Sequence, residues 1–281
     1  MSVPASPNPL TIALTGATGR MGRMIAHATL ADPSVQIIAA STEANDPHVG
    51  EDLGRVIGGD GTAMAVAIKA NAEALFTGVV TPQVLIDFTT APASMTHVKL
   101  AADRGTPVML GTTGHNQKQG EEIRKLAKKI PIAWCANTSI GVAVLSRLVE
   151  ETARVLADMD WDIEIGEVHH KHKIDAPSGT ALALGRAAAK GQGKELDHPR
   201  KETREGRRPK NDIGFAVMRG GDVAGEHSVL FLGECERLEL THRANDRVIF
   251  AKGAITAAKW IADPKRKPGL YTMADVLGLG G

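Results

Sequence analysis

LTIALTGATGRMG, which runs from Leu10 to Gly22, joins a short apolar run to three closely spaced glycines. Apolar side chains then recur at helical spacing, as in Met24 and Ile25, before a second apolar run from Val35 to Ala40. This order predicts a strand, a tight turn, a helix and a second strand within ~30 residues. Glycines at such a turn let the backbone approach a pyrophosphate at the helix N-terminus. The stretch favours dinucleotide binding over the alternative of plain turn glycines.

More apolar runs follow, and their hydrophobicity is continuous rather than alternating. They lie at Val84 to Phe88, Val108 to Leu110 and Ile132 to Trp134, separated by helix-like segments at 91–104 and 117–129. Continuous apolar strands are typical of a parallel sheet that is covered on both faces. We therefore expect an α/β, Rossmann-like dinucleotide-binding domain.

The pattern changes after Asn137. A long helical segment from Gly141 to Asp158 leads into WDIEIGEV, in which apolar and acidic residues alternate as in a half-exposed strand. Three more short strands are predicted, at Phe215 to Arg219, Ser228 to Leu232 and Arg237 to Thr241. This part is expected to form an α+β domain with an open mixed sheet.

These patterns give two domains. Residues 1–139 and 249–281 form the dinucleotide-binding domain, because the chain is helical again from Val248, and residues 140–248 form the second domain. The charged segment from Gly191 to Asp212 has almost no large apolar residues, so we expect a surface loop or a flexible arm.

Composition excludes several classes of protein. The formal net charge is +1 and there are nine Trp, Tyr and Phe residues in 281, so nucleic-acid binding is not expected. No segment has the apolar length of a membrane span, and the first residues lack the pattern of a secretory signal. Two distant cysteines, Cys135 and Cys235, favour a reducing compartment, so the cytoplasm is expected.

A second candidate site lies in EVHHKHKIDAPSGTA, from Glu167 to Ala181, where three histidines and two lysines occupy five consecutive positions. Such cations are best tolerated beside an anionic ligand, and the helix-start signal that follows them adds backbone N–H donors. A small carboxylate fits this pattern. The alternative of a metal site lacks supporting Cys or HExxH spacing.

Strand-end loops suggest further contacts. In an open α/β sheet these loops line the ligand crevice, which places Gly111 to Gly114 and Cys135 to Asn137 near a cofactor. Glu43 lies 21 positions after Gly22, where a carboxylate can accept hydrogen bonds from a ribose. Cys135 also raises the alternative of an acylating aldehyde dehydrogenase, although a small buried cysteine is the simpler interpretation.

GATGRMG, GTTG, FAVMRGGDVAGEH and above all HHxxKxDAPSGT resemble the 4-hydroxy-tetrahydrodipicolinate reductases, formerly called dihydrodipicolinate reductases. The resemblance implies an NADH- or NADPH-dependent enzyme of lysine and diaminopimelate biosynthesis that forms a homotetramer through its second domain. It implies hydride transfer to ring carbon four of a cyclic dicarboxylate, with loss of the hydroxyl as water.

The resemblance also assigns roles to residues. His169 is the expected catalytic acid/base, Lys173 the proton donor or substrate anchor, and His170, Gly179 and Thr180 are expected to bind substrate. The expected cofactor contacts are Gly16, Ala17, Thr18, Gly19, Arg20, Met21, Glu43, Gly111, Thr112, Thr113, Cys135, Ala136, Asn137 and Thr138.

Two positions depart from the family pattern. After the second strand the residues are Ser41-Thr42-Glu43-Ala44, without an Arg to bind a 2′-phosphate, so NADH should be used at least as well as NADPH. Thr138 replaces an aromatic residue. Outside the enzymes, the alternative is a nicotinamide-sensing protein without turnover, but a sensor has no need of a positioned proton donor.

Overall fold

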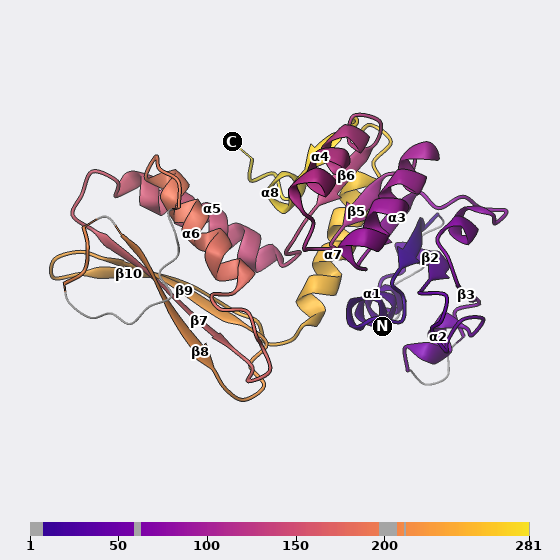
Figure 1. Cartoon of the computed structure of the whole chain (residues 1–281), viewed down its shortest axis with the longest axis horizontal. Coiled ribbons are helices and arrows are strands. Elements are labelled where there is room, and N and C mark those ends of the chain that lie inside the picture. Colours follow the sequence, from indigo (N-terminus) through magenta and orange to yellow (C-terminus); the bar gives the residue numbers. More distant parts are fainter. Residues whose placement is uncertain (1–7, 59–62, 197–206, 211, 281) are drawn as a thin grey trace. The chain divides into compact units, whose positions relative to one another are not determined.

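The structure is a computed structural model, and it describes residues 8–58, 63–196, 207–210 and 212–280. The chain divides into two compact units, residues 1–139 with 248–281 and residues 140–247 (Figure 1). The second boundary lies one residue earlier than expected. Much of the segment predicted as a loop or arm, at 197–206 and 211, lies outside the described residues.

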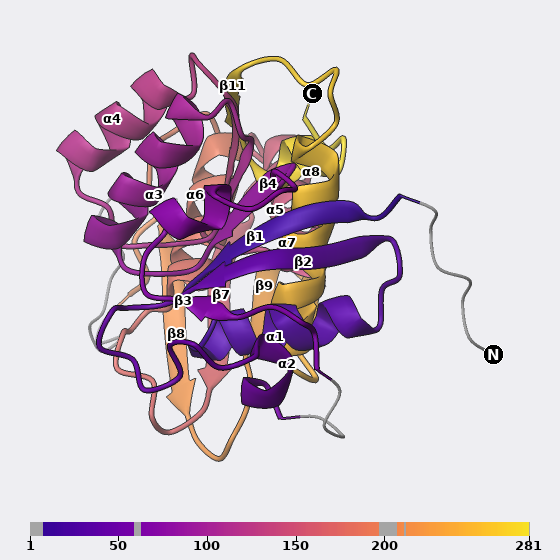
Figure 2. The same ribbon diagram turned by 90° about the vertical axis from the view of Figure 1, so that its right-hand side faces the viewer.

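The first unit is built on a seven-stranded sheet in the order β11-β6-β5-β4-β1-β2-β3. Figure 2 labels β11, β4, β1, β2 and β3 of this sheet. Every pairing in it is parallel. The strands are β1 (Leu10–Thr15), β2 (Val35–Ser41), β3 (Ile68–Lys69), β4 (Val84–Asp87), β5 (Val108–Leu110), β6 (Pro131–Trp134) and β11 (Gly269–Tyr271). The central strands β4 and β5 are buried along their whole length. The predicted Rossmann-like fold is confirmed.

Helices cover both faces of this sheet. One face carries α1 (Arg20–Leu30) and α7 (Val248–Ile261), which contact each other, and the other carries α3 (Ala91–Asp103) and α4 (Gln117–Leu126). The short elements are α2 (Leu53–Val56), η1 (Glu73–Phe76) and α8 (Met273–Val276). Asn116 and Gln119 form a capping box that fixes the start of α4. Because the strands of this sheet are parallel, their carboxyl ends lie along one edge, where ligands bind in such folds.

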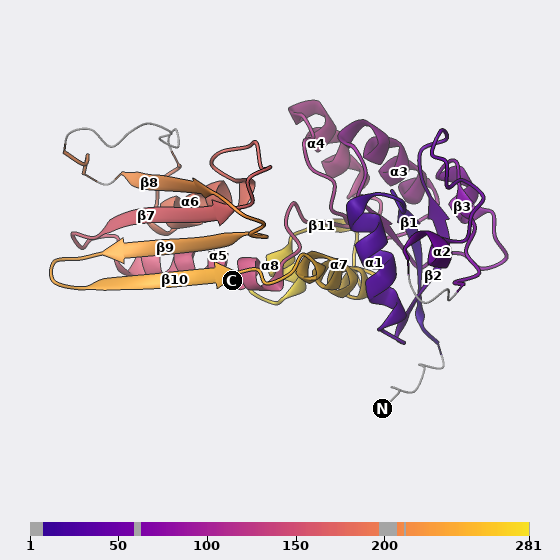
Figure 3. The ribbon, with the colours of Figure 1, turned by 90° about the horizontal axis from the view of Figure 1, so that it is seen from below.

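The second unit contains a four-stranded sheet in the order β10-β9-β7-β8 (Figure 3). Its strands are β7 (Asp162–His169), β8 (Ile213–Arg219), β9 (Glu226–Leu232) and β10 (Arg237–Arg243). Only β7 and β8 are parallel, so the sheet is mixed, as predicted. Helices α5 (Ile140–Val155) and α6 (Gly179–Gly191) pack on one face, and burial alternates along β7 and β9 accordingly.

Two edge strands of the first unit were not predicted. β3 and β11 have two and three residues, and both are too short for a hydrophobic period to show. In the described part of the chain, no helix combines the length and the apolar character needed to cross a membrane.

Candidate functional site

The glycine-rich turn after β1 requires glycine at two positions. Gly16 has a φ of +69°, and a Cβ there would lie 2.5 Å from the carbonyl oxygen of Phe88. A Cβ on Gly22 would lie 2.1 Å from the carbonyl oxygen of Gly16. Since side chains are excluded, the backbone comes close to whatever lies at the N-terminus of α1. This cradle fits the pyrophosphate of a dinucleotide.

A cavity of about 660 Å³ opens beside this turn. Gly16, Thr18, Gly19 and Glu43 line it, so the structure brings together four of the expected cofactor residues from the ends of β1 and β2. Its lining, as far as the described residues show it, carries three carboxylates and neither Lys nor Arg; the carboxylates belong to Glu43, Asp46 and Glu73. Such a lining suits the ribose hydroxyls of NADH better than the 2′-phosphate of NADPH.

Hydroxyl groups join the turn to the end of β2. The Thr18 hydroxyl lies 2.6 Å from that of Thr42 and donates to Asp46 at 2.7 Å. Hydrogen bonds, first that from Thr18, lower the pKa of Asp46, so this carboxylate is ionised. Thr42 and Asp46 were not predicted as site residues.

Asp87, at the end of β4, is wholly buried beneath the same edge. It accepts hydrogen bonds from the Thr15 hydroxyl (2.8 Å), the Thr112 hydroxyl (2.5 Å) and His97 Nδ1 (2.6 Å). Burial alone would raise the pKa of Asp87, but these hydrogen bonds, led by that from His97, outweigh it and lower the pKa. The hydrogen bonds of Asp87 thus connect the ends of β1, β4 and β5. His97 also lines the cavity.

The other expected cofactor residues lie outside the lining of this cavity. Ala17 is wholly buried, Arg20 and Met21 begin α1, and a Cβ on Gly111 would collide with the Phe88 ring. The Thr138 hydroxyl donates to the Phe250 carbonyl. Gly111, Thr112, Thr113, Cys135, Ala136, Asn137 and Thr138 do follow β5 and β6, at the carboxyl edge of the sheet.

Cys135 is buried, which disfavours a role as a nucleophile. Burial, with a smaller contribution from Asp275, raises the pKa of its thiol to about 12. A thiolate would therefore hardly form near neutral pH. This removes the physical basis for the acylating-dehydrogenase alternative.

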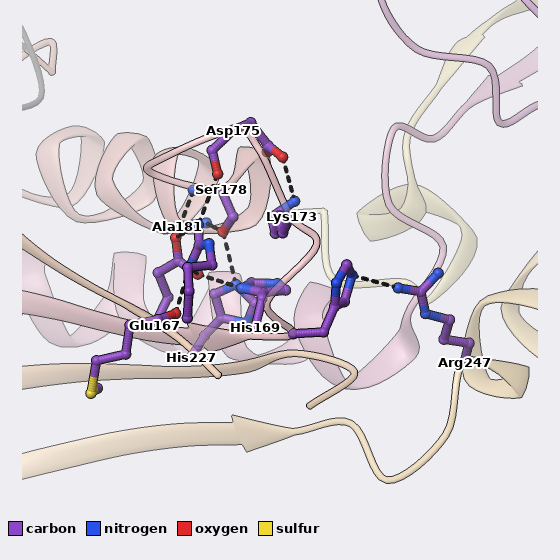
Figure 4. A network of polar contacts seen from close by, with 11 residues as sticks. Glu167, His169, Lys173, Asp175, Ser178, Ala181, His227 and Arg247 are labelled. Atoms are coloured by element: carbon purple, nitrogen blue, oxygen red, sulfur yellow. Dashed lines mark hydrogen bonds and ion pairs between the residues drawn. The ribbon is translucent and has the colours of Figure 1, made fainter. Parts of the chain in front are cut away.

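The second candidate site surrounds the end of β7 (Figure 4). Glu167 and His169 point to the same buried face because residues two apart in a strand share a face. The Glu167 carboxylate accepts from both Nη atoms of Arg219 and from the backbone N–H of Ser178, each at 2.9 Å. It is also hydrogen-bonded to His169 Nδ1.

Both groups have shifted pKa values. Burial would raise the pKa of Glu167, but its donors, led by Arg219, lower the pKa instead. Burial lowers the pKa of His169, Lys173 and Arg219 lower it further, and Glu167 partly opposes them. At neutral pH the pair is thus an ionised carboxylate beside a neutral imidazole.

A second histidine packs against this pair. The rings of His169 and His227 meet edge to face with centroids 5.0 Å apart, and His227 Nε2 lies 3.1 Å from the Ser178 hydroxyl. Burial and the nearby His169 lower the pKa of His227 to about 4. His227 therefore stays neutral and contributes no positive charge to the site.

The remaining predicted residues lie on the loop between β7 and α6 or in the first turn of α6. Lys173 Nζ forms an ion pair with Asp175 at 2.8 Å, and His170 Nε2 lies 2.8 Å from Arg247 Nη2. Gly179 and Thr180 open α6, whose N-cap Ser178 accepts from the Ala181 N–H. Cations and the positive end of a helix thus gather on one loop, which suits a carboxylate.

Glu167, His169 and His227 also lie close enough together to hold a metal ion. Arg219 argues against it, because its guanidinium already binds both carboxylate oxygens and would repel a second cation.

The sequence offered signals for some of the residues that the prediction missed. Glu167 lies two positions before His169 in an alternating strand, which places both on one face. Arg219 has no such signal, because its place opposite His169 depends on the pairing of β7 with β8.

Known proteins match most of the chain. "Dihydrodipicolinate reductase, N-terminus" matches residues 10–138 and "Dihydrodipicolinate reductase, C-terminus" matches residues 141–277. The chain belongs to the dihydrodipicolinate reductase family. Relatives named 4-hydroxy-tetrahydrodipicolinate reductase include one from Thiobacillus denitrificans, 44% identical over 271 residues (95% of this chain, 98% of that protein), and one from Magnetococcus marinus, 42% identical over 272 residues (96% and 98%). The resemblance found in the sequence is confirmed, and the chain is a dinucleotide-dependent oxidoreductase.

Solved structures support the fold. A dipicolinate-bound dihydrodipicolinate reductase from Paenisporosarcina sp. TG-14 has a TM-score of 0.74 at 24% identity, covering 95% of this chain and 98% of that one. An amine dehydrogenase from Mycobacterium smegmatis has a TM-score of 0.59 at 13% identity, covering 95% and 96%. At these identities the likeness concerns the fold alone.

Proposed function

We propose that the chain reduces 4-hydroxy-tetrahydrodipicolinate to tetrahydrodipicolinate with NADH or NADPH, in lysine and diaminopimelate biosynthesis. The observation that carries the proposal is the loop from His169 to Thr180, where two candidate proton-transfer groups stand beside the N-terminus of α6. In a member of this family, these groups can bind the carboxylates of a cyclic dicarboxylate and transfer protons to and from its ring.

The first unit binds the cofactor in this proposal. Gly16 and Gly19 place backbone N–H groups at the pyrophosphate, and Glu43 accepts from a ribose hydroxyl. Contacts in the rest of the expected set come from the loops after β5 and β6. When bound, the nicotinamide supplies a hydride.

Lys173, His170 and the first residues of α6, Gly179 and Thr180, bind the substrate carboxylates. Each offers a charge or a donor that a carboxylate prefers over water in a partly buried site. Lys173 is already paired with one carboxylate, that of Asp175, at 2.8 Å. A substrate carboxylate would take over or share that ammonium.

The reaction consumes one hydride and one proton, and it releases one water. Lys173 lies on the same loop and can donate the proton that the departing hydroxyl needs. His169 is neutral at rest, so its unprotonated ring nitrogen can take up a proton and return it. Both groups then re-equilibrate with solvent.

We further propose that NADH is used at least as well as NADPH. Three carboxylates line the cavity beside the glycine turn, where the extra phosphate of NADPH would lie near like charge. The described lining offers no Lys or Arg to compensate.

We also propose that the protein is a cytoplasmic homotetramer. Helices α5 and α6 lie on one face of the second sheet (Figure 3). The alternation along the strands places Leu230, Leu232 and Met218 on the other face. A second copy of the chain is the expected cover. Cys135 and Cys235 are both unpaired, which suits a reducing compartment.

The test is steady-state oxidation of NADH and NADPH at 340 nm, coupled to a synthase that makes the substrate from pyruvate and aspartate semialdehyde. The proposal predicts turnover that depends on both the synthase and this protein. Cofactor binding without turnover would support a sensor instead. Sedimentation under the same conditions tests the tetramer.

A further inference from the structure

We propose that Glu167, clamped by Arg219 and Ser178, is the positioning residue that sets the tautomer and orientation of His169. This inference rests on the proposed function for its kinetic consequence. The side chain of Glu167 is 1% exposed, so it acts through His169 rather than by touching substrate.

The clamp leaves Glu167 one arrangement. One carboxylate oxygen accepts from the Ser178 N–H and Arg219 Nη2, and the other accepts from Arg219 Nη1 and His169 Nδ1. Arg219 is itself anchored, because its Nη2 also donates to the Asp175 carbonyl at 2.8 Å. A carboxylate held by a planar bidentate pair cannot rotate without breaking it.

The ionised carboxylate decides where the imidazole proton lies. A carboxylate with a lowered pKa only accepts hydrogen bonds, so His169 Nδ1 must carry the proton. The other ring nitrogen, Nε2, is then the atom that can exchange a proton with substrate. Within the described residues Nε2 has no hydrogen-bond partner, and about a tenth of the side chain remains exposed.

The neighbouring backbone keeps Nε2 uncovered. Gly225 has a φ of +153°, and a Cβ there would lie 3.0 Å from His169 Nε2. Any side chain at this position would therefore press on the nitrogen that the clamp presents. Nδ1 is thus covered by Glu167, whereas Nε2 faces a residue without a side chain.

Electrostatics add a second effect. The charged or titratable groups that face His169 are Glu167, Arg219, Lys173 and His227. Of these only Glu167 favours the imidazolium, while burial and the two cations oppose it. Without Glu167, the pKa of His169 would fall further and proton uptake in the reaction would cost more.

A carboxylate elsewhere in the same unit shows what a purely structural pair looks like. Glu150, 9% exposed, lies 2.9 Å from Arg154 and 3.0 Å from Lys190, and among the described residues it has no histidine partner. Since Glu150→Gln removes a similar buried ion pair far from the loop chemistry, it is the matched control for Glu167→Gln.

The kinetic test compares kcat, substrate KM and pH profiles for the two variants. In Glu167→Gln, only one carboxamide atom can accept, so the amide nitrogen turns toward Nδ1 and favours the wrong tautomer. We expect kcat to fall about 100-fold or more with KM within threefold, and the acidic limb to move to lower pH. Glu150→Gln should keep wild-type kcat, and Glu167→Asp should recover part of the loss. Equal losses in both Gln variants, or an effect on KM alone, would overturn the proposal.

A second readout does not depend on turnover or on a variant of Glu167. In the wild-type protein with ¹⁵N-labelled histidine, assigned by comparison with His169→Gln, the proposal predicts the Nδ1–H tautomer for neutral His169. An Nε2–H tautomer would overturn it. If wild-type protein shows the expected tautomer but reduces no cyclic dicarboxylate, the proposed function fails and the clamp stands.

Discussion

Both units bury a carboxylate that is hydrogen-bonded to a histidine Nδ1 atom, Asp87 in the first and Glu167 in the second. Asp87 takes its other hydrogen bonds from threonines on three strand ends, so its charge holds the sheet edge together. Glu167 takes its others from an arginine and a backbone N–H, so its charge is fixed relative to one histidine. The same kind of pair therefore joins strand ends in one unit and, in the proposed mechanism, positions a proton-transfer group in the other.

The largest expected contrast lies between the two histidines. His169→Gln should lower kcat about 100-fold or more, because it removes a proposed proton-transfer group, and Lys173→Ala should do the same. His97→Gln should leave kcat within about threefold and raise the KM for NADH, since His97 lines the cofactor cavity. Near-normal turnover in both His169→Gln and Lys173→Ala would contradict the assignment.

Asp87→Asn should chiefly affect stability. It removes a buried ionised carboxylate and leaves its hydrogen-bond donors with a poorer acceptor, so we expect a loss of about 3 kcal/mol in the free energy of unfolding. Asp103→Asn, exposed at the end of α3, is the control and should change it by less than about 0.5 kcal/mol. Urea unfolding measures both. If Asp87→Asn changed kcat but not the free energy of unfolding, Asp87 would not have the structural role described above.

His227 should make the stability of the second unit pH-dependent. Its folded pKa of about 4 lies below the unfolded value of 6.5, so the unfolded state binds more protons and stability falls as pH drops below 6.5. Between pH 7 and pH 5 this contributes about 2 kcal/mol, which His227→Gln should remove. Parallel pH dependence in wild type and variant, by urea unfolding, would show that His227 titrates normally.

The cofactor cavity should respond to a single added cation. Ala44→Arg places a basic residue directly after Glu43 and should raise kcat/KM for NADPH relative to NADH about tenfold, since it offsets the acidic lining. Ala44→Gln is the neutral control. A wild-type protein that already prefers NADPH tenfold would refute the interpretation of this lining.

The smallest effect is expected at Cys135. With a thiol pKa of about 12, it offers no thiolate, so Cys135→Ser should keep kcat within about twofold. A folded Cys135→Ser variant without turnover would indicate that the thiol takes part in the reaction.

Continuous apolar runs and the glycine turn were enough to predict the first unit, because local hydrophobic pattern sets buried parallel strands. β3 and β11 were not predicted, because two or three residues are too few to show a hydrophobic periodicity. The mixed sheet followed from alternation in β7, but its order depends on pairings between distant segments.

The candidate sites divide in the same way. Runs such as HHxxKxDAPSGT place several functional groups on one loop, so they are visible in the sequence. Asp87 with His97 and Glu167 with Arg219 are separated by 10 and 52 positions, and only the fold brings each pair together.

The most direct test of the account is inhibition by pyridine-2,6-dicarboxylate in wild type, Lys173→Ala and Lys171→Ala. Lys171 is an exposed lysine two positions away and serves as the matched control. We predict inhibition that competes with the dicarboxylate substrate, with an inhibition constant at least about tenfold higher in Lys173→Ala only. Competition with NADH instead, or equal inhibition of all three proteins, would contradict a dicarboxylate site on this loop.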